Sequence, residues 1–280
     1  MGKKEKTRFL IVWLIITLVF LVGSFVVPSP EKSETVKVMM RDAVLHEENR
    51  CSFFGLMSVS PAMISAMVVS GCLLLAALLI RIFAIPRFKM VPGKFQSAIE
   101  LLVSTFDNLA KTNSPRRNSF LGVYAFGAGV YIFVGTLFEL FGVQVMTISG
   151  HSVSLPAPLS DVNAAISLGV LSYFVIFAGG ILGNGVKGIS LGLKKFSLPL
   201  SMSFRLFGAL LSGLLVTELV YYYASLSYVL PVIVAVLFTL LHALIQAYVL
   251  TMLTAMFYGE VSEPPLKSAK KLIAKSTIKE

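Results

Sequence analysis

One arginine lies inside a long apolar stretch in the C-terminal half of the chain. Arg205 is the only charged residue of "SMSFRLFGALLSG", residues 201–213, and a guanidinium keeps its charge at every physiological pH. Charged side chains within membrane-spanning segments are costly and mark ion or substrate pathways. The chemistry expected of Arg205 is therefore electrostatic: it attracts an anion or repels a cation.

Four other polar residues on the last two apolar stretches belong to the same candidate site. Glu218 follows Arg205 by thirteen residues, and Thr239, His242 and Gln246 recur every three to four residues, so they share one helix face. If the two stretches form an antiparallel hairpin with its turn at 224–228, Arg205 and Gln246 each lie roughly 25–30 Å from that turn. The Gln246 amide then accepts a hydrogen bond from the guanidinium without neutralising it.

Three residues on earlier segments could form the outer mouth of an ion pathway through Glu218 and His242. They are Glu139, Asp161 and Asn163. Asp161 is equally a helix N-cap, Glu139 a solvated interfacial carboxylate, and His242 a hydrogen-bonded core histidine.

Small residues surround Arg205 along its helix. They let another helix approach closely, either within this chain or from a partner that brings the missing counter-charge. These residues are Gly208, Ala209, Ser212 and Gly213.

The elements that carry these residues are membrane helices. The chain of 280 residues is 56% apolar and 14% charged, which is typical of an integral membrane protein. Between the second and third apolar runs, residues 93–112 have an apolar face at helical spacing, which predicts an amphipathic helix on a membrane surface. We expect an all-α polytopic membrane protein with a long tilted C-terminal hairpin. Its six apolar runs, each near the length needed to span a bilayer, are Phe9–Val27, Pro61–Ala84, Phe120–Val143, Ala164–Leu182, Phe196–Tyr223 and Val229–Tyr258.

Lys and Arg residues gather in alternate connections. The segments 3–8, 81–118, 183–195 and 267–279 hold 19 of the 24 basic residues. By the positive-inside rule these segments and both chain ends are cytoplasmic. The net charge of +10 thus reports topology and predicts no nucleic-acid partner. The first run is a retained helix or a signal peptide, and either choice leaves residues 28–57 outside.

The chain lacks the sequence signals of catalysis. It has two cysteines, Cys51 and Cys72, which are too few for a disulfide framework. It has no glycine-rich phosphate loop and no Cys/His cluster, so we expect no cofactor, no metal and no active site of its own.

Four ordered segments resemble subunit a of the F-type ATP synthase membrane sector. They are "VPGKFQSAIELL", "SDVNAAISLGV", "SFRLFG" with Pro199 upstream, and "LIQAYVLTMLTAMFY". The likeness spans residues 58–262, which divides the chain into an N-terminal anchor or signal with an outer segment (1–57), a subunit-a-like domain (58–262) and a basic tail (263–280).

The resemblance implies a bundle in a bacterial inner membrane, packed against a ring of c subunits, with b-type stalk subunits and the rest of the F1Fo complex as partners. Two offset half-channels would carry H⁺ or Na⁺, and Arg205 would keep each ring carboxylate deprotonated and block an ion short-circuit. The sequence departs from the family at Ala209, Leu214 and Thr239. The alternative is a secondary transporter that binds an anionic substrate near Arg205.

Overall fold

The computed structural model describes residues 8, 11–16, 18, 19, 22, 51–53, 57–116, 119–141, 143–146, 152–222 and 235–263. The apolar segments within this part are helical, as expected, and the strands form two short antiparallel pairs, β1 with β2 and β3 with β4. Most of the first apolar run and the expected turn at 224–228 lie outside the described residues. In chain order the elements are β1 (Cys51–Phe53), β2 (Met57–Val59), α3 (Pro61–Leu79), the π-helix η1 (Ile80–Ala84), the 3₁₀ turn η2 (Ile85–Arg87), α4 (Lys94–Asn113), α5 (Ser119–Phe138), η3 (Glu139–Phe141), β3 (Gln144–Met146), β4 (Ser152–Ser154), η4 (Pro158–Ser160), α6 (Val162–Asn184), α7 (Val186–Leu193), α8 (Ser197–Tyr222), the π-helix η5 (Ala235–Thr239) and α10 (Leu240–Ser262).

Four helical stretches among the described residues are long and apolar enough to cross a membrane: Pro61–Arg87, Ser119–Phe141, Val162–Asn184 and Val236–Ser262. They match the second, third, fourth and sixth expected runs. The fifth run forms α8, and the expected amphipathic helix forms α4. The chain is therefore an integral membrane protein.

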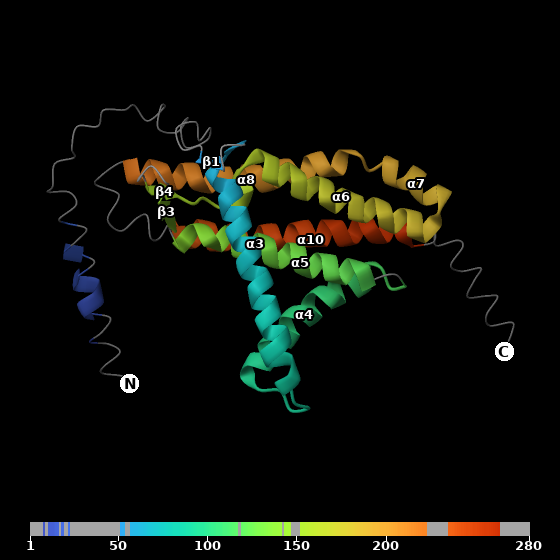
Figure 1. Cartoon of the computed structure of the whole chain (residues 1–280), viewed down its shortest axis with the longest axis horizontal. Coiled ribbons are helices and arrows are strands. Elements are labelled where there is room, and N and C mark those ends of the chain that lie inside the picture. Colours follow the sequence, from blue (N-terminus) through green and yellow to red (C-terminus); the bar gives the residue numbers. More distant parts are fainter. Residues whose placement is uncertain are drawn as a thin grey trace.

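Helix α3 stands apart from the other long helices. It begins at Pro61, whose fixed φ suits the first helical turn, and it buries residues only near its start, such as Ala62 and Val69. Most of its remaining apolar side chains are exposed; Leu74 is 72% exposed. In Figure 1, α3 crosses the layer of α5, α6, α8 and α10 steeply, and the connection to α4 projects away from that layer.

Helix α6 lies between α8 and α10 and packs extensively against both. Direct packing of α8 on α10 is minor, so the expected hairpin partners are joined mainly through α6. Glycines on α6 explain this arrangement. A Cβ at Gly169 would come within 2.8 Å of the Pro199 carbonyl oxygen on α8, and one at Gly179 would overlap the Tyr258 ring on α10.

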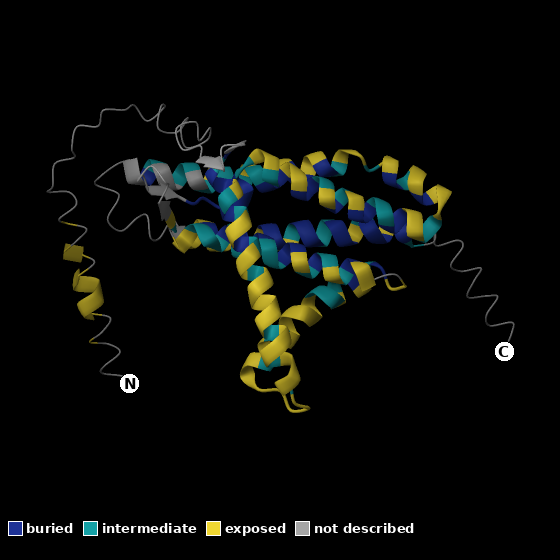
Figure 2. Ribbon diagram, in the orientation of Figure 1, coloured by how far each residue is buried: buried dark blue, intermediate teal, exposed yellow. Residues whose placement is uncertain are grey.

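The core lies where α5, α6, α8 and α10 face one another, as the buried surfaces in Figure 2 show. Its hydroxyl groups are satisfied within the helices, because Ser203 and Thr254 donate to the carbonyl four residues earlier. The Ser172 hydroxyl likewise donates to Leu168, so Tyr124 donates to the Ser172 oxygen, at 2.7 Å, and links α5 to α6. Among the described residues, buried side-chain polar atoms therefore all have hydrogen-bond partners, so their burial in the apolar interior carries no unpaired donor.

Hydrogen bonds and one ion pair join the segments that the positive-inside rule places on the cytoplasmic side. Glu263 accepts bonds from the Ser114 hydroxyl and, through its backbone oxygen, from the Asn184 amide. Lys195 pairs with Glu260, with 2.9 Å between Nζ and Oε1. These contacts bring the end of α4, the end of α6, the α7–α8 connection and the end of α10 together, as the predicted topology requires.

Candidate functional site

Helix α8 has one buried face and one exposed face, and Arg205 lies on the exposed one. Met202, Leu206 and Leu210 are buried at intervals of four residues against the core. Arg205, Gly208 and Ser212 are exposed, and their spacing of three and four residues places them on one side of the helix. Ala209 and Gly213, which were expected beside Arg205, are half-buried.

The Arg205 guanidinium has no hydrogen-bond or ion-pair partner among the side chains that the structure describes. Gly208 and Gly213 also border open space, because a Cβ added to either would meet no atom within 4 Å. Packing within the described part of the chain therefore does not require glycine at these two positions. The exposed face of α8 thus combines a permanent positive charge with residues small enough to let another helix approach closely.

A small cavity lies between α5, α8 and α10, close to this face. It is lined by Thr136, Glu139, Ala209, Leu210, Gly213, Phe238, Thr239 and His242. Ala209 follows Arg205 by one turn, about 6 Å along the helix axis. The cavity volume of about 10 Å³ is near the minimum that holds one water molecule.

The structure thus brings together five of the residues that the sequence singled out. Glu139 arrives from η3, directly after α5, Ala209 and Gly213 come from α8, Thr239 from η5 and His242 from α10. Glu139 and His242 are the ionisable groups of the cavity, and they come from segments about a hundred residues apart.

A π-helical turn shapes one wall of the cavity. Residues Ala235–Thr239 form η5, directly before α10 begins at Leu240. Such wide turns inside long helices occur frequently at functional sites. Here the turn supplies both Phe238 and Thr239 to the wall.

A hydrogen bond fixes the ring of His242. Its Nδ1 lies 2.8 Å from the Phe238 carbonyl oxygen. A carbonyl oxygen only accepts, so Nδ1 carries the proton and Nε2 of the neutral ring is an acceptor. The ring also stacks on Phe238, with 5.7 Å between centroids. His242 is thus held in one orientation and keeps one nitrogen available for proton exchange.

Gln246 occupies different surroundings from His242. Gln246 is 6% exposed, on the face of α10 that also buries Ala243, Ala247 and Leu250. No hydrogen bond between its amide and Arg205 occurs among the described side chains. Glu218 lies on the last turns of α8, and its side chain lies outside the described part.

Asp161 and Asn163 do not line the cavity. Asp161 caps α6: its carboxylate accepts the Asn163 backbone N–H at 2.8 Å and the Ser60 hydroxyl at 2.7 Å. Asn163 is exposed on the first turn of α6. The helix-cap alternative explains Asp161, because both its oxygens serve the start of α6 and the start of α3.

Sequence reasoning missed Thr136 and Phe238. Thr136 precedes Glu139 by three residues on α5 and is buried, with its hydroxyl bonded to the Ile132 carbonyl oxygen. The helical spacing of Thr136 and Glu139 was a usable signal. Nothing in the sequence marks Phe238, since aromatic residues are common in such helices. No group of three or more metal-binding side chains occurs among the described residues.

Comparison with known protein families identifies the family of the chain. A family model described as ATP synthase A chain matches residues 64–259. The match covers α3 to α10 and includes Arg205, the cavity and Gln246. It supports an ion-translocating subunit of the membrane sector and gives no support to an anion transporter. The chain belongs to the ATP synthase A chain family.

Proposed function

We propose that Arg205 holds the carboxylate of each passing c subunit in its charged form and blocks direct ion flow between two half-channels. The observation that carries this proposal is the exposed guanidinium on α8, with no partner among the described side chains. A charge left this way in an apolar helix is costly unless another molecule supplies its counter-ion. A rotating ring supplies one repeatedly and transiently.

The magnitude of the pairing is sufficient for this role. Two unit charges about 4 Å apart at an effective dielectric of about 20 attract by about 4 kcal/mol, which equals roughly three pKa units. The ring carboxylate would therefore release its ion beside Arg205. Lysine is a poorer choice here, because a buried lysine loses its proton and with it the barrier.

The cavity beside Ala209 is the proposed end of the outer half-channel. Glu139, Thr239 and His242 supply polar atoms around a space near the size of one water molecule. Ions would pass from these groups to the ring carboxylate one helix turn away, with Glu218 contributing from the end of α8. Gln246 would act as a dipole at the level of Arg205 and help to order the guanidinium.

The small residues on α8 are the proposed clearance for the ring. The side chains beside Arg205 are small and leave room for the helices of the ring: they belong to Gly208, Ala209, Ser212 and Gly213. The open space at Gly208 and Gly213 fits this role. The remaining proposed partners are the b-type stalk subunits and the rest of the F1Fo complex. The proposed location is a bacterial inner membrane, with both chain ends in the cytoplasm.

Replacement of Arg205 tests the mechanism. In inverted membrane vesicles that contain the assembled complex, Arg205→Ala should abolish ATP-driven ion pumping, because the ring carboxylate keeps its ion. Passive ion leak through the membrane sector should rise, because the positive barrier is gone. Gln246→Ala is the matched control, since it removes a dipole and leaves the barrier, and it should retain part of the pumping. Pumping by Arg205→Ala at the parental rate would refute the proposal. Dependence of ATP hydrolysis on Na⁺ distinguishes Na⁺ from H⁺ as the transported ion.

A further inference from the structure

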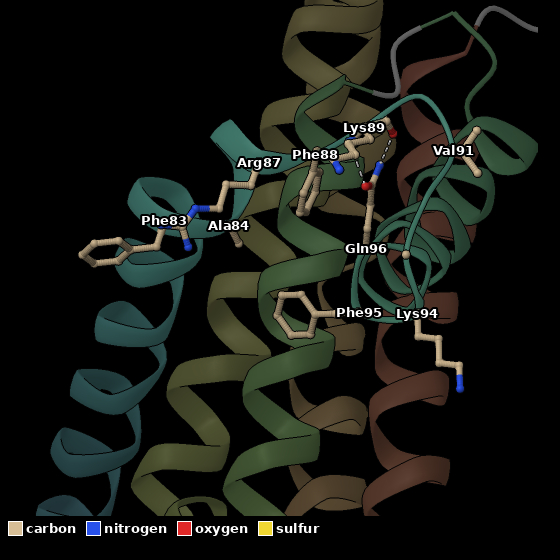
Figure 3. Close-up of a pocket in the computed structure, with 10 residues that line it drawn as sticks. Phe83, Ala84, Arg87, Phe88, Lys89, Val91, Lys94, Phe95 and Gln96 are labelled. Carbon is tan, nitrogen blue, oxygen red and sulfur yellow. Dashed lines mark hydrogen bonds between the residues drawn. The ribbon is translucent and has the colours of Figure 1, made fainter.

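The connection between α3 and α4 forms an open groove that the proposed ion pathway does not use. Its volume is about 700 Å³, and no acidic residue lines it. In Figure 3, Arg87 extends beside Phe83 and Lys94 extends away on the α4 side, with Phe88 and Phe95 between them. The lining residues are Phe83, Ala84, Arg87, Phe88, Lys89, Val91, Gly93, Lys94, Phe95 and Gln96.

The groove lies at the depth of lipid headgroups. The apolar helix that leads to it, Pro61–Arg87, has 27 residues, whereas about 20 residues cross the hydrocarbon core of a bilayer. The last turns of this helix, which carry Arg87, therefore extend into the polar interface. The groove thus has cations at headgroup level, and its three phenylalanines lie where they can border acyl chains.

Gln96 holds the groove in shape. Its side-chain oxygen accepts the Lys89 backbone N–H at 3.0 Å, and its Nε2 donates to the Lys89 carbonyl oxygen at 2.9 Å. These reciprocal bonds fasten the loop to the first turn of α4. Gln96 Nε2 also donates to the Glu100 carboxylate at 2.7 Å. This carboxylate, which lies near the groove, is therefore hydrogen-bonded to Gln96.

The cations of the groove form no ion pair in the described part of the chain. Neither of its ion pairs, Lys111 with Asp107 and Lys195 with Glu260, involves Arg87, Lys89 or Lys94. The tip of the loop is also apolar and open: Met90 is 101% exposed and Val91 84% exposed. A patch with unpaired cations beside exposed apolar side chains is complementary to an amphiphilic anion, and less so to a free inorganic anion.

We propose that this groove binds an anionic phospholipid. Arg87, Lys89 and Lys94 contact its phosphate-bearing headgroup, while Phe83, Phe88 and Phe95 border its acyl chains. Basic pockets at the cytoplasmic ends of membrane helices bind anionic headgroups in this way. The bound lipid would fix α3, which has few contacts with the rest of the chain beyond its first turns, relative to the surface helix α4.

Photocrosslinking of the assembled complex tests the proposal. The purified complex is placed in phosphatidylcholine nanodiscs that contain a trace of diazirine-tagged phosphatidylglycerol or, separately, of diazirine-tagged phosphatidylcholine. Labelled peptides are then mapped by mass spectrometry. We expect the anionic probe to label the segment 82–100 severalfold more than the zwitterionic probe does. Equal labelling by the two lipids would overturn the proposal, as would loss of the anionic label in excess inorganic phosphate.

A matched pair of variants locates the charge. Arg87→Gln with Lys94→Gln should reduce the anionic labelling severalfold, to near the level of the zwitterionic probe, since each cation near a membrane surface contributes up to about fivefold. Lys187→Gln with Lys194→Gln removes the same charge from exposed positions around α7 and should leave the labelling of 82–100 unchanged. Equal loss in both variants would show a general charge effect and refute a site.

A second measurement separates a lipid from a protein in the groove. A photoreactive benzoylphenylalanine replaces Met90, which contacts nothing that the substitution would disturb at 101% exposure. In the assembled complex it should crosslink to lipid. A crosslink to another subunit would overturn the proposal in favour of a protein interface. Both measurements are independent of ion transport, so they stand or fall separately from the role of Arg205.

Discussion

At His242, one hydrogen bond decides what the side chain can exchange. Because Nδ1–H is committed to the Phe238 carbonyl oxygen, only Nε2 is available to a water molecule or ion in the cavity. With Nδ1 engaged in this way, the neutral ring accepts a hydrogen bond only at Nε2. The residue next to the proposed pathway is thus oriented by its own helix.

Removal of His242 should slow ion transport. His242→Ala deletes one relay group, and the loss of a hydrogen bond of about 1–1.5 kcal/mol lowers the ATP-driven pumping rate by about tenfold. Leu241→Ala is the control, because Leu241 is exposed on the same helix and does not line the cavity. Pumping rates in inverted vesicles measure the difference. Equal rates for the two variants would exclude His242 from the pathway.

At the scale of elements, the two faces of helix α8 differ in packing. Toward α6 it packs tightly, and Gly169 of α6 leaves room for the Pro199 carbonyl group and the Ser203 side chain. On the side of Arg205 it is open at Gly208. The same small residue type thus serves packing within the chain on one face and, in our proposal, clearance for the ring on the other.

Bulky substitutions on these two faces should have different effects. Gly169→Leu should destabilise the packing of α6 on α8 by about 1–3 kcal/mol or more, because the added atoms overlap fixed backbone, and should lower the amount of folded subunit in membranes. Gly208→Leu should leave that amount unchanged and reduce pumping, because the leucine projects toward the ring. Immunoblots of membranes and pumping assays measure both. A loss of folded subunit for Gly208→Leu as large as that for Gly169→Leu would contradict the two-face description.

For the whole molecule, hydrogen bonds and an ion pair group the segments that were expected on one side of the membrane. Glu263 and Glu260 connect the end of the last helix to Ser114, Asn184 and Lys195. At the other end, Ser60 and Asp161 connect the starts of α3 and α6. Residues 60 and 161 were both expected at the outer surface, so the packing agrees with the distribution of basic residues.

Labelling of single cysteines tests this topology. In a chain without Cys51 and Cys72, cysteines at positions 90 and 187 should react with a membrane-impermeant maleimide in inverted vesicles only. A cysteine in place of the exposed Phe141 should react only in right-side-out vesicles. The positive-inside rule gives this direction. Reaction of positions 90 and 187 from opposite sides would reject the predicted orientation.

The local properties of the chain could be predicted from its sequence because they depend on near neighbours. Apolar run length located α3, α5, α6, α8 and α10, helical periodicity located α4, and spacing placed Ser212 on the face of Arg205 with Gly208 at its edge. Ordered motifs identified the family. Each of these signals is contained within about twenty residues, the length over which helix period and bilayer thickness act.

Only the tertiary structure decided which distant residues meet. It placed α6 between α8 and α10, because Gly169 and Gly179 allow close approach there, and the expected hairpin packing became minor. It assigned Asp161 to the cap of α6 and joined Glu139 to His242 around one cavity. Such outcomes depend on the shape of packed surfaces far apart in the sequence, and no local pattern of residue types records that shape.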